Sequence, residues 1–235
     1  MKRFLPYVIS GVVIFSACST VPVTRYSNAY KEPGFGMGVD VAMGRELSMG
    51  INSDGCTYDD DSLEYWYPLI GISGYFNFSP NLSFMAKTYT LYLKTADGIQ
   101  IGMDFIPYKS ESFAIGADLN LSYIYTTAPY TFMSSIMDFS YSAQGIMADI
   151  YFSKPLVNKK RFKLIANLGV KSMYSHLKVA DSVNFNFFEA GGFVNLYTKF
   201  YFLHIVPEVA LMVIQSPTNK HYLQFFPGIY IALGK

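Results

Sequence analysis

The densest cluster of reactive side chains in the sequence is acidic and surrounds Cys56. Its carboxylates are Asp54, Asp59, Asp60, Asp61 and Glu64. Crowded oxygen ligands could hold Ca²⁺, but the spacing lacks the alternate ligands, central glycine and distant glutamate of an EF-hand. The carboxylates also disfavour the reactive thiolate form of Cys56. The pattern indicates a solvated acidic loop with a passive thiol, and we expect no cofactor or metal.

His204 and Glu208 are a second candidate for chemistry, as a base and an acid on one face of a predicted strand. Ser140 and Ser142 could supply a nucleophilic hydroxyl. Four residues along a strand span about 13 Å, so His204 and Glu208 cannot share a hydrogen bond directly. Nothing in the sequence brings either serine close to His204. We therefore expect a protein that is not an enzyme and assign no catalytic residue.

A third set of ionisable side chains falls on the polar faces of segments whose other faces are apolar. The set is Asp104, Asp118, Lys163, Lys171, His204 and Glu208. Faces of mostly Gly, Ser, Asn, Thr and Ala with isolated charges suit the crowded lumen of a barrel. An unpaired buried ion costs several kcal/mol. We predict that these six side chains point into a lumen and pair across it as a polar network.

The elements that must position these residues are β-strands. Apolar and polar residues alternate with a period of two in 99–105, 113–125 and 162–174, as expected for strands with one apolar face. Reading the chain in this way predicts ten strands, at 35–50, 64–79, 82–95, 99–108, 112–126, 137–153, 161–176, 184–200, 202–215 and 222–234. The predicted fold is all-β, an antiparallel up-and-down transmembrane barrel of about ten strands. Eight strands are possible if two hairpins are misassigned.

The predicted connections alternate approximately between short and long, as in membrane barrels with short periplasmic turns and longer external loops. The short ones are 79–81, 109–111 and the link near Tyr201, and the longer ones are 51–63, 127–136, 177–183 and 216–221. Two connections depart from the rule. Residues 96–98 read as a tight turn on the external side, and 154–160 is long for the periplasm. A bulge is expected within 147–152.

The N-terminus carries an export signal. Lys2 and Arg3 precede an apolar run, Phe4 to Phe15, that is shorter than the roughly 20 residues of a membrane-spanning helix. The small residues before Cys18 resemble the lipobox of bacterial lipoproteins, in which the cysteine is lipidated and becomes the mature N-terminus. We predict three parts: a signal peptide at 1–18, a periplasmic linker at 19–34 and a barrel at 35–235. Ordinary cleavage near Cys18 or an unprocessed anchor are the alternatives to lipidation.

Composition separates a membrane barrel from a soluble one. Only 15% of the residues are charged, against about 25% in typical soluble domains, and the net charge is +1. No basic face suits nucleic acid, so that class of partner is excluded. A soluble exterior would carry many Lys and Glu, whereas here the apolar faces are nearly free of charge and end in aromatic residues. We therefore expect the apolar faces to contact lipid.

Over residues 35–235 this architecture resembles the small outer-membrane barrels of the OmpA-like and OmpX-like kind. The resemblance lies in the strand pattern and includes no sequence motif. It implies location in the outer membrane of a Gram-negative bacterium, with outer-membrane lipid and the barrel-assembly machinery as partners. The external ligand is left open.

Four functions fit these observations. The leading one is a barrel without enzymatic activity, plugged by its own side chains, with a structural or surface-interaction role. The alternatives are a narrow pore for small solutes, a lipid A-modifying hydrolase that uses His204, and a lipid-tethered lipocalin-like carrier. The last would turn its apolar strand faces inward, so the direction of those faces separates it from the others.

Overall fold

The computed structural model describes residues 28–45, 49–52, 55–58, 66–91, 97–126, 130–132, 135–137, 141–179, 183–215 and 221–234. All regular elements in these ranges are β-strands, which confirms the predicted all-β fold. No helix among them is long and apolar enough to span a membrane. The predicted signal peptide with Cys18, and the acidic residues that flank Cys56, lie outside the described residues.

Ten strands form one closed antiparallel barrel, as the alternation predicts. They are β1 (Gly34–Arg45), β4 (Trp66–Ser79), β5 (Leu82–Leu91), β6 (Asp97–Lys109), β7 (Ala114–Thr126), β10 (Tyr141–Lys159), β11 (Phe162–Val179), β12 (Val183–Phe200), β13 (Leu203–Gln215) and β14 (His221–Gly234). Their order around the wall is β1, β14, β13, β12, β11, β10, β7, β6, β5, β4. The barrel closes at β1, where Val39 pairs with Ile231 of β14 on one side and with Ile72 of β4 on the other. Closure leaves no unpaired sheet edge.

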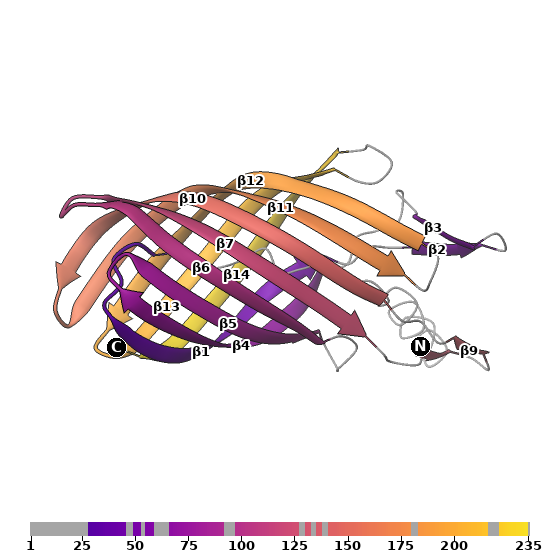
Figure 1. The fold of residues 1–235 in the computed structure, drawn as a ribbon, viewed down its shortest axis with the longest axis horizontal. Coiled ribbons are helices and arrows are strands. Elements are labelled where there is room, and N and C mark those ends of the chain that lie inside the picture. The colour runs from indigo at the N-terminus through magenta and orange to yellow at the C-terminus, as the bar shows by residue number, and fades with distance from the viewer. Residues whose placement is uncertain are drawn as a thin grey trace, which may run out of the picture.

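The strand connections differ between the two ends of the barrel (Figure 1). At one end, where β14 also finishes, the links are residues 80–81, 110–113, 160–161 and 201–202; we call this the short-turn end. The opposite, long-loop end includes two small hairpins, β2 (Met49–Asn52) with β3 (Gly55–Tyr58) and β8 (Tyr130–Phe132) with β9 (Ser135–Met137). The first and last barrel strands thus begin and finish at the short-turn end.

Three local predictions are wrong. Strand β10 continues through the predicted connection 154–160, because a register shift between Pro155 and Val157 accommodates the proline within the ladder. The register is regular over 147–152, where the bulge was expected. The predicted tight turn at 96–98 does not form, since Asp97 already pairs with Thr90 and the link from β5 to β6 is residues 92–96.

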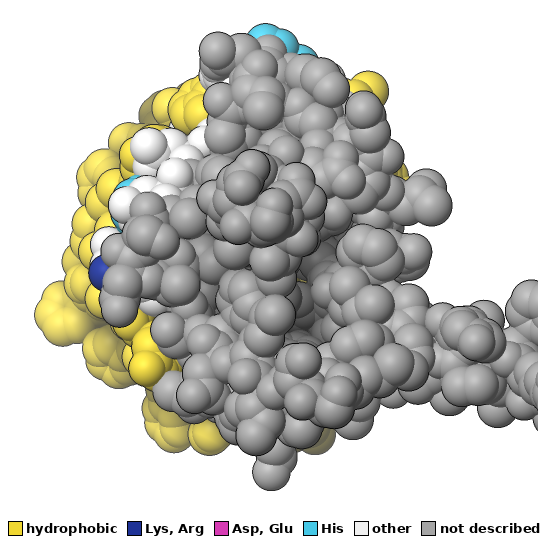
Figure 2. All heavy atoms as spheres, turned by 90° about the vertical axis from the view of Figure 1, so that its right-hand side faces the viewer, with side chains coloured by type: hydrophobic (Ala, Val, Ile, Leu, Met, Phe, Trp, Pro, Cys, Tyr) yellow, Lys and Arg dark blue, Asp and Glu magenta, His cyan; other side chains and the backbone are white. Residues whose placement is uncertain are grey.

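The two faces of the barrel wall differ sharply in composition. Outward side chains are large and apolar, and Ile72, Val170 and Leu223 are 57%, 61% and 66% exposed. Inward side chains include many polar and charged groups, such as Asp104 and Lys171, which are at most 2% exposed. Hydrophobic side chains also dominate the part of the wall visible in Figure 2. The apolar strand faces therefore point outward, opposite to the arrangement of a lipocalin-like barrel.

Aromatic residues gather at both ends of this outer surface. Exposed rings near the short-turn end are Phe35, Phe78, Tyr108, Tyr201 and Phe202, and those near the long-loop end are Tyr123, Tyr125, Tyr174 and Phe188. Mostly aliphatic side chains, with some rings such as Phe84 and Phe225, fill the region between them. The ten residue-to-residue steps of β7 from Ile115 to Tyr125 extend about 33 Å, which a strand tilt of about 40° converts to about 25 Å along the barrel axis. This is the height of the apolar band of outer-membrane barrels.

Apolar side chains form a buried cluster inside the lumen near the long-loop end. Inward residues at this end of their strands are Leu69, Tyr89, Ile124, Leu177, Phe187 and Ile214, and each is at most 4% exposed. Below them, toward the short-turn end, the lumen holds the charged groups described in the next subsection. The interior is therefore a packed core with an apolar and a polar part.

The packing of β12 against β13 gives a prediction about glycine. A Cβ added at Gly191 would lie 2.0 Å from the Leu211 carbonyl oxygen, whereas one added at Gly74 meets nothing within 4 Å. We expect Gly191→Ala to lower the free energy of unfolding by about 1 to 3 kcal/mol, the usual cost of overpacking. Gly74→Ala is the matched control and should stay within about 0.5 kcal/mol of wild type. Urea unfolding in detergent micelles measures both, and equal stability of the two variants would contradict the observed packing.

Candidate functional site

Lys171 is the centre of a fully buried ion cluster in the lumen. Its Nζ lies 2.7 Å from Glu208 Oε1 on β13 and 3.9 Å from Asp149 Oδ2 on β10. The side chains of Lys171, Asp149 and Glu208 are all fully buried. The ammonium also lies 4.2 Å from the centre of the Phe193 ring, within the range of a cation–π contact. The cluster joins three strands of the wall through the lumen.

Three aspartates lie side by side on the inner face of β6, β7 and β10. Asp104 is opposite Asp118, and Asp118 is opposite Asp149. We call Asp104, Asp118 and Asp149 the acidic row. Like charges directly opposite each other destabilise a sheet, so the row requires nearby cations and donors. Lys171 forms an ion pair with Asp149, and the Tyr151 hydroxyl donates to Asp104 Oδ1 at 2.8 Å.

A second row lies on the next three strands, β11, β12 and β13. Lys163 is opposite Lys199, and Lys199 is opposite His204. We call Lys163, Lys199 and His204 the basic row. All three side chains are inward and buried. Six consecutive strands of the wall therefore carry two oppositely charged rows.

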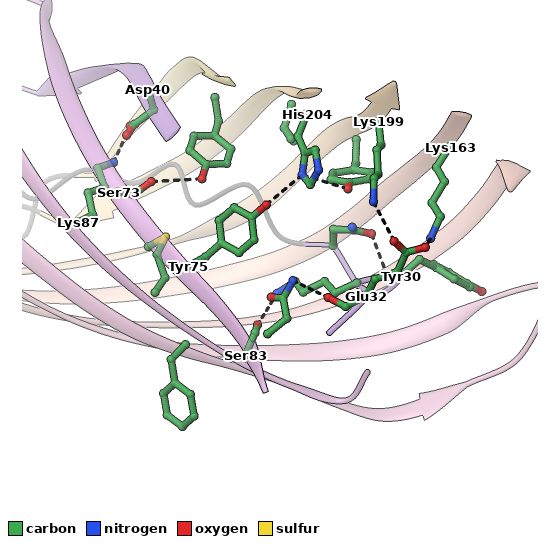
Figure 3. Close-up of a pocket in the computed structure, with 18 residues that line it drawn as sticks. Tyr30, Glu32, Asp40, Ser73, Tyr75, Ser83, Lys87, Lys163, Lys199 and His204 are labelled. Atoms are coloured by element: carbon green, nitrogen blue, oxygen red, sulfur yellow. Dashed lines mark hydrogen bonds and ion pairs between the residues drawn. The ribbon is translucent and has the colours of Figure 1, made fainter. Parts of the chain in front are cut away.

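Residues 28–33 lie inside the lumen and connect the two rows. Lys31 forms an ion pair with Asp104 of the acidic row and donates to Ser83 Oγ at 2.7 Å. The next residue, Glu32, accepts from Lys163 at 2.8 Å and from Lys199 at 2.9 Å (Figure 3). This segment falls in the predicted periplasmic linker, 19–34. The charges of the lumen wall bind its described part, residues 28–33.

Uncharged contacts fix the same segment. The Tyr30 hydroxyl donates to the Ser110 carbonyl at 2.8 Å, and Asn77 Nδ2 donates to the Glu32 carbonyl at 2.9 Å. Ala29 N donates to Ser153 Oγ at 3.3 Å. From there the hydrogen bonds continue through Asn167 and Asn195 to Glu208. The segment and the Lys171 cluster thus belong to one connected polar network.

His204 is surrounded by tyrosines. Its Nδ1 lies 3.5 Å from the Tyr75 hydroxyl and 3.3 Å from the Tyr197 hydroxyl. It stands at the start of β13 beside the 201–202 turn, whereas Ser142 is at the start of β10, at the other end of the barrel. Ser140 lies outside the described residues. Of the two serines that the sequence suggested for a hydrolase, the described one, Ser142, therefore does not lie near His204.

A small cavity adjoins the segment at the short-turn end. Its volume is about 80 Å³, and the residues around it include Tyr75, Lys87, Tyr197 and His204. Drug-sized ligands need about 300 Å³ or more, so this space fits only water or a small ion. No group of three His, Cys, Asp or Glu residues in the described ranges is arranged to hold a metal ion.

The six predicted lumen residues are all buried, at 0% to 8% exposure. Lys171 and Glu208 form a direct ion pair with each other. Asp104 and Lys163 pair instead with Lys31 and Glu32 of the N-terminal segment, and His204 contacts tyrosines. The prediction missed a second buried pair, Lys87 Nζ with Asp40 Oδ2 at 2.6 Å. Strand parity could have placed Lys199 in the lumen, because it follows Asn195 and Tyr197 on the inward face.

No family model and no curated protein matches this chain. Among solved structures, the outer membrane protease OmpT of Escherichia coli is 8% identical, with a TM-score of 0.40 over 88% of this chain and 98% of that one. OprB of Pseudomonas putida is 13% identical, with a TM-score of 0.25 over 84% and 70%. The outer membrane protein OmpT of Vibrio cholerae is 9% identical, with a TM-score of 0.22 over 92% and 100%. Similarity at this level says nothing about a shared activity.

The contacts of Glu32 give a prediction about pH. Hydrogen bonds from Lys163 and Lys199 lower the pKa of the Glu32 carboxyl from 4.5 to about 2, and Lys109 and His204 also interact with it electrostatically. A lowered folded-state pKa means that the carboxylate stabilises the fold fully above its ordinary pKa of 4.5 and loses this effect as the pH falls toward 2. Wild type should therefore melt above a Glu32→Gln variant at neutral pH, and the gap should close across this acidic range. A gap that is unchanged by acid would contradict the ion pairs.

Proposed function

We propose that this chain is an outer-membrane β-barrel without enzymatic activity, whose lumen is closed at rest and whose long-loop end meets partners outside the cell. The observation that carries the proposal is the outward apolar face of the barrel strands. Water would solvate such a surface poorly, whereas lipid acyl chains match it. The closed barrel also leaves no backbone group unpaired at a sheet edge, as a membrane requires.

The two ends of the barrel support an orientation. Outer-membrane barrels place short turns in the periplasm and longer loops outside. The short-turn end would then be periplasmic, and the connections from β1 to β4 and from β7 to β10 would face outward. Because β1 starts at the short-turn end, a lipid on Cys18 would enter the inner leaflet of the outer membrane. Lipid and the barrel-assembly machinery are the partners that this proposal requires.

The closed lumen supports a structural or surface-interaction role over transport. Apolar side chains fill the lumen near the long-loop end, and residues 28–33 fill it near the short-turn end. Solutes could pass only if both the apolar side chains and residues 28–33 moved out of the lumen. We infer that the two long external connections, with their hairpins β2–β3 and β8–β9, present the functional surface.

Cell fractionation with gel migration tests the proposal. The mature chain should sediment with the outer membrane and migrate faster in unboiled than in boiled SDS samples. A Cys18→Ala variant that is still exported and processed should also remain integral, because the wall rather than the lipid holds the protein in the membrane. Release of this variant as soluble protein, with no heat-dependent shift, would overturn the proposal.

A narrow, gated pore is the second candidate, favoured by the acidic and basic rows. Charged side chains of one sign line selective pores, and each row here gathers charges of one sign, which Lys31 and Glu32 neutralise. Planar-bilayer recording separates the two candidates. Wild type and a variant with residues 28–33 replaced by a Gly-Ser segment of equal length should both lack discrete conductance steps if the barrel is structural. Steps that appear only in the variant would favour the pore.

A further inference from the structure

The basic row places two like charges directly opposite each other, and the anion that neutralises them is not part of the barrel wall. Lys163 and Lys199 are directly opposite each other on β11 and β12, and His204 is the next inward residue along the same row. Their side chains are buried, with 10% exposure for Lys163 and 7% for Lys199. Two ammonium groups this close repel each other and require an anion between them. The wall thus provides a site of positive charge.

The anion between the two lysines comes from outside the wall. Glu32 Oε1 accepts from Lys163 at 2.8 Å, and Glu32 Oε2 accepts from Lys199 at 2.9 Å. Each carboxylate oxygen thus accepts a hydrogen bond from one ammonium group (Figure 3). This is the geometry in which lysines bind a free carboxylate or phosphate. Glu32 occupies the site as a ligand would.

The occupant is more exposed than the site. The side chain of Glu32 is 43% exposed, several times more than either lysine. The cavity of about 80 Å³ beside it has room for several water-sized groups, since one such group needs about 10 to 15 Å³. The wall positions of the lysines are set by the β11–β12 ladder and do not depend on Glu32. The carboxylate can therefore leave while the strands that carry the two lysines stay in place.

We propose that Lys163 and Lys199 form a binding site for a small oxyanion of the phosphate class, and that Glu32 is its intramolecular occupant. Phosphate carries more charge than a carboxylate and enough oxygens to reach both ammonium groups. Chloride carries a single charge on one atom and so attracts the two ammonium groups less strongly than phosphate. The site goes beyond the proposed function, because it depends only on the lumen and not on what surrounds the barrel.

Titration of inorganic phosphate into the full-length mature protein in detergent micelles tests the site. Calorimetry at neutral pH should show one saturable site in Glu32→Gln and about tenfold weaker binding in wild type, where the carboxylate competes. Glu32→Gln keeps the backbone carbonyl that accepts from Asn77. Adding Lys199→Met to Glu32→Gln should weaken phosphate binding by about tenfold or more, through the loss of one charged hydrogen bond. Adding Lys154→Met, on an exposed lysine, is the matched control and should leave it unchanged.

Two results would overturn the proposal. One is that Glu32→Gln binds phosphate no better than wild type. The other is that Lys199→Met and Lys154→Met affect binding equally. If Glu32→Gln folds poorly, its refolding yield is compared in phosphate and in chloride at equal ionic strength. A higher yield in phosphate supports the site, and equal yields reject it.

Discussion

Lys171→Met is expected to lower the free energy of unfolding by about 3 to 5 kcal/mol, the cost of breaking a buried ion pair by removing one partner. The loss leaves the carboxylates of Glu208 and Asp149 in the lumen without the ammonium that lies between them. Urea unfolding in micelles, followed by the heat-dependent gel shift, measures the effect. Lys154→Met removes an exposed lysine and should change stability by less than about 0.5 kcal/mol.

The double variant Lys171→Met with Glu208→Leu sharpens this prediction. If the two side chains act as a pair, the double variant should be less destabilised than the sum of the two single variants. Additive effects would mean that the 2.7 Å contact carries little coupling energy. A Lys171→Met protein as stable as Lys154→Met would contradict the burial of the cluster.

Leu168→Arg is the second substitution with a large expected effect. Leu168 points outward, is 60% exposed and lies midway between Phe162 and Tyr174 on β11. An arginine at the midplane of a lipid-facing wall costs about 2 to 4 kcal/mol, and this falls to about 0 to 1 kcal/mol near the interface. We therefore expect Leu168→Arg to lower the stability of the barrel in lipid vesicles by the larger amount.

Leu156→Arg is the matched control for this substitution. Leu156 is 54% exposed, but it lies near the short-turn end of β10, where water and headgroups can solvate a guanidinium. Refolding yield and urea unfolding in vesicles compare the two variants. If both arginines were equally harmless, the wall would not face lipid, because a water-exposed surface tolerates a new charge at either height.

Much of the fold could be predicted from the sequence because a membrane barrel repeats one local rule. In 113–125 the alternation of apolar and polar residues predicts which face each side chain is on. The same rule predicts all ten barrel strands, with ends that differ from the observed ones by at most six residues. The rule failed locally at Pro155, where a bulge keeps β10 in the ladder despite a proline. Alternation alone left open which face points inward, and the structure decides this in favour of the polar face.

The candidate site was less predictable, because its contacts join residues far apart in sequence. Lys163 meets Glu32 across 131 positions, and Lys199 meets the same carboxylate across 167. Residues 28–33 have no strand periodicity, so nothing local indicates that they enter the lumen. Strand parity identified six inward charges of the wall and missed others, among them Lys87 and Lys199, and the partner of each charge depends on register and on this segment.

The most direct test of the lipid-facing wall is collision accessibility of spin labels in vesicles. Labels would be placed at Ile72, Leu121 and Val213 on three outward faces, and at Glu111 in an exposed short turn, in a background with Cys18→Ala and Cys56→Ser. We predict that the three wall labels collide freely with oxygen, which dissolves in lipid, and rarely with a water-soluble nickel complex. The Glu111 label should show the reverse. Free access of the nickel complex to the wall labels would contradict a membrane barrel and would indicate a surface in contact with water.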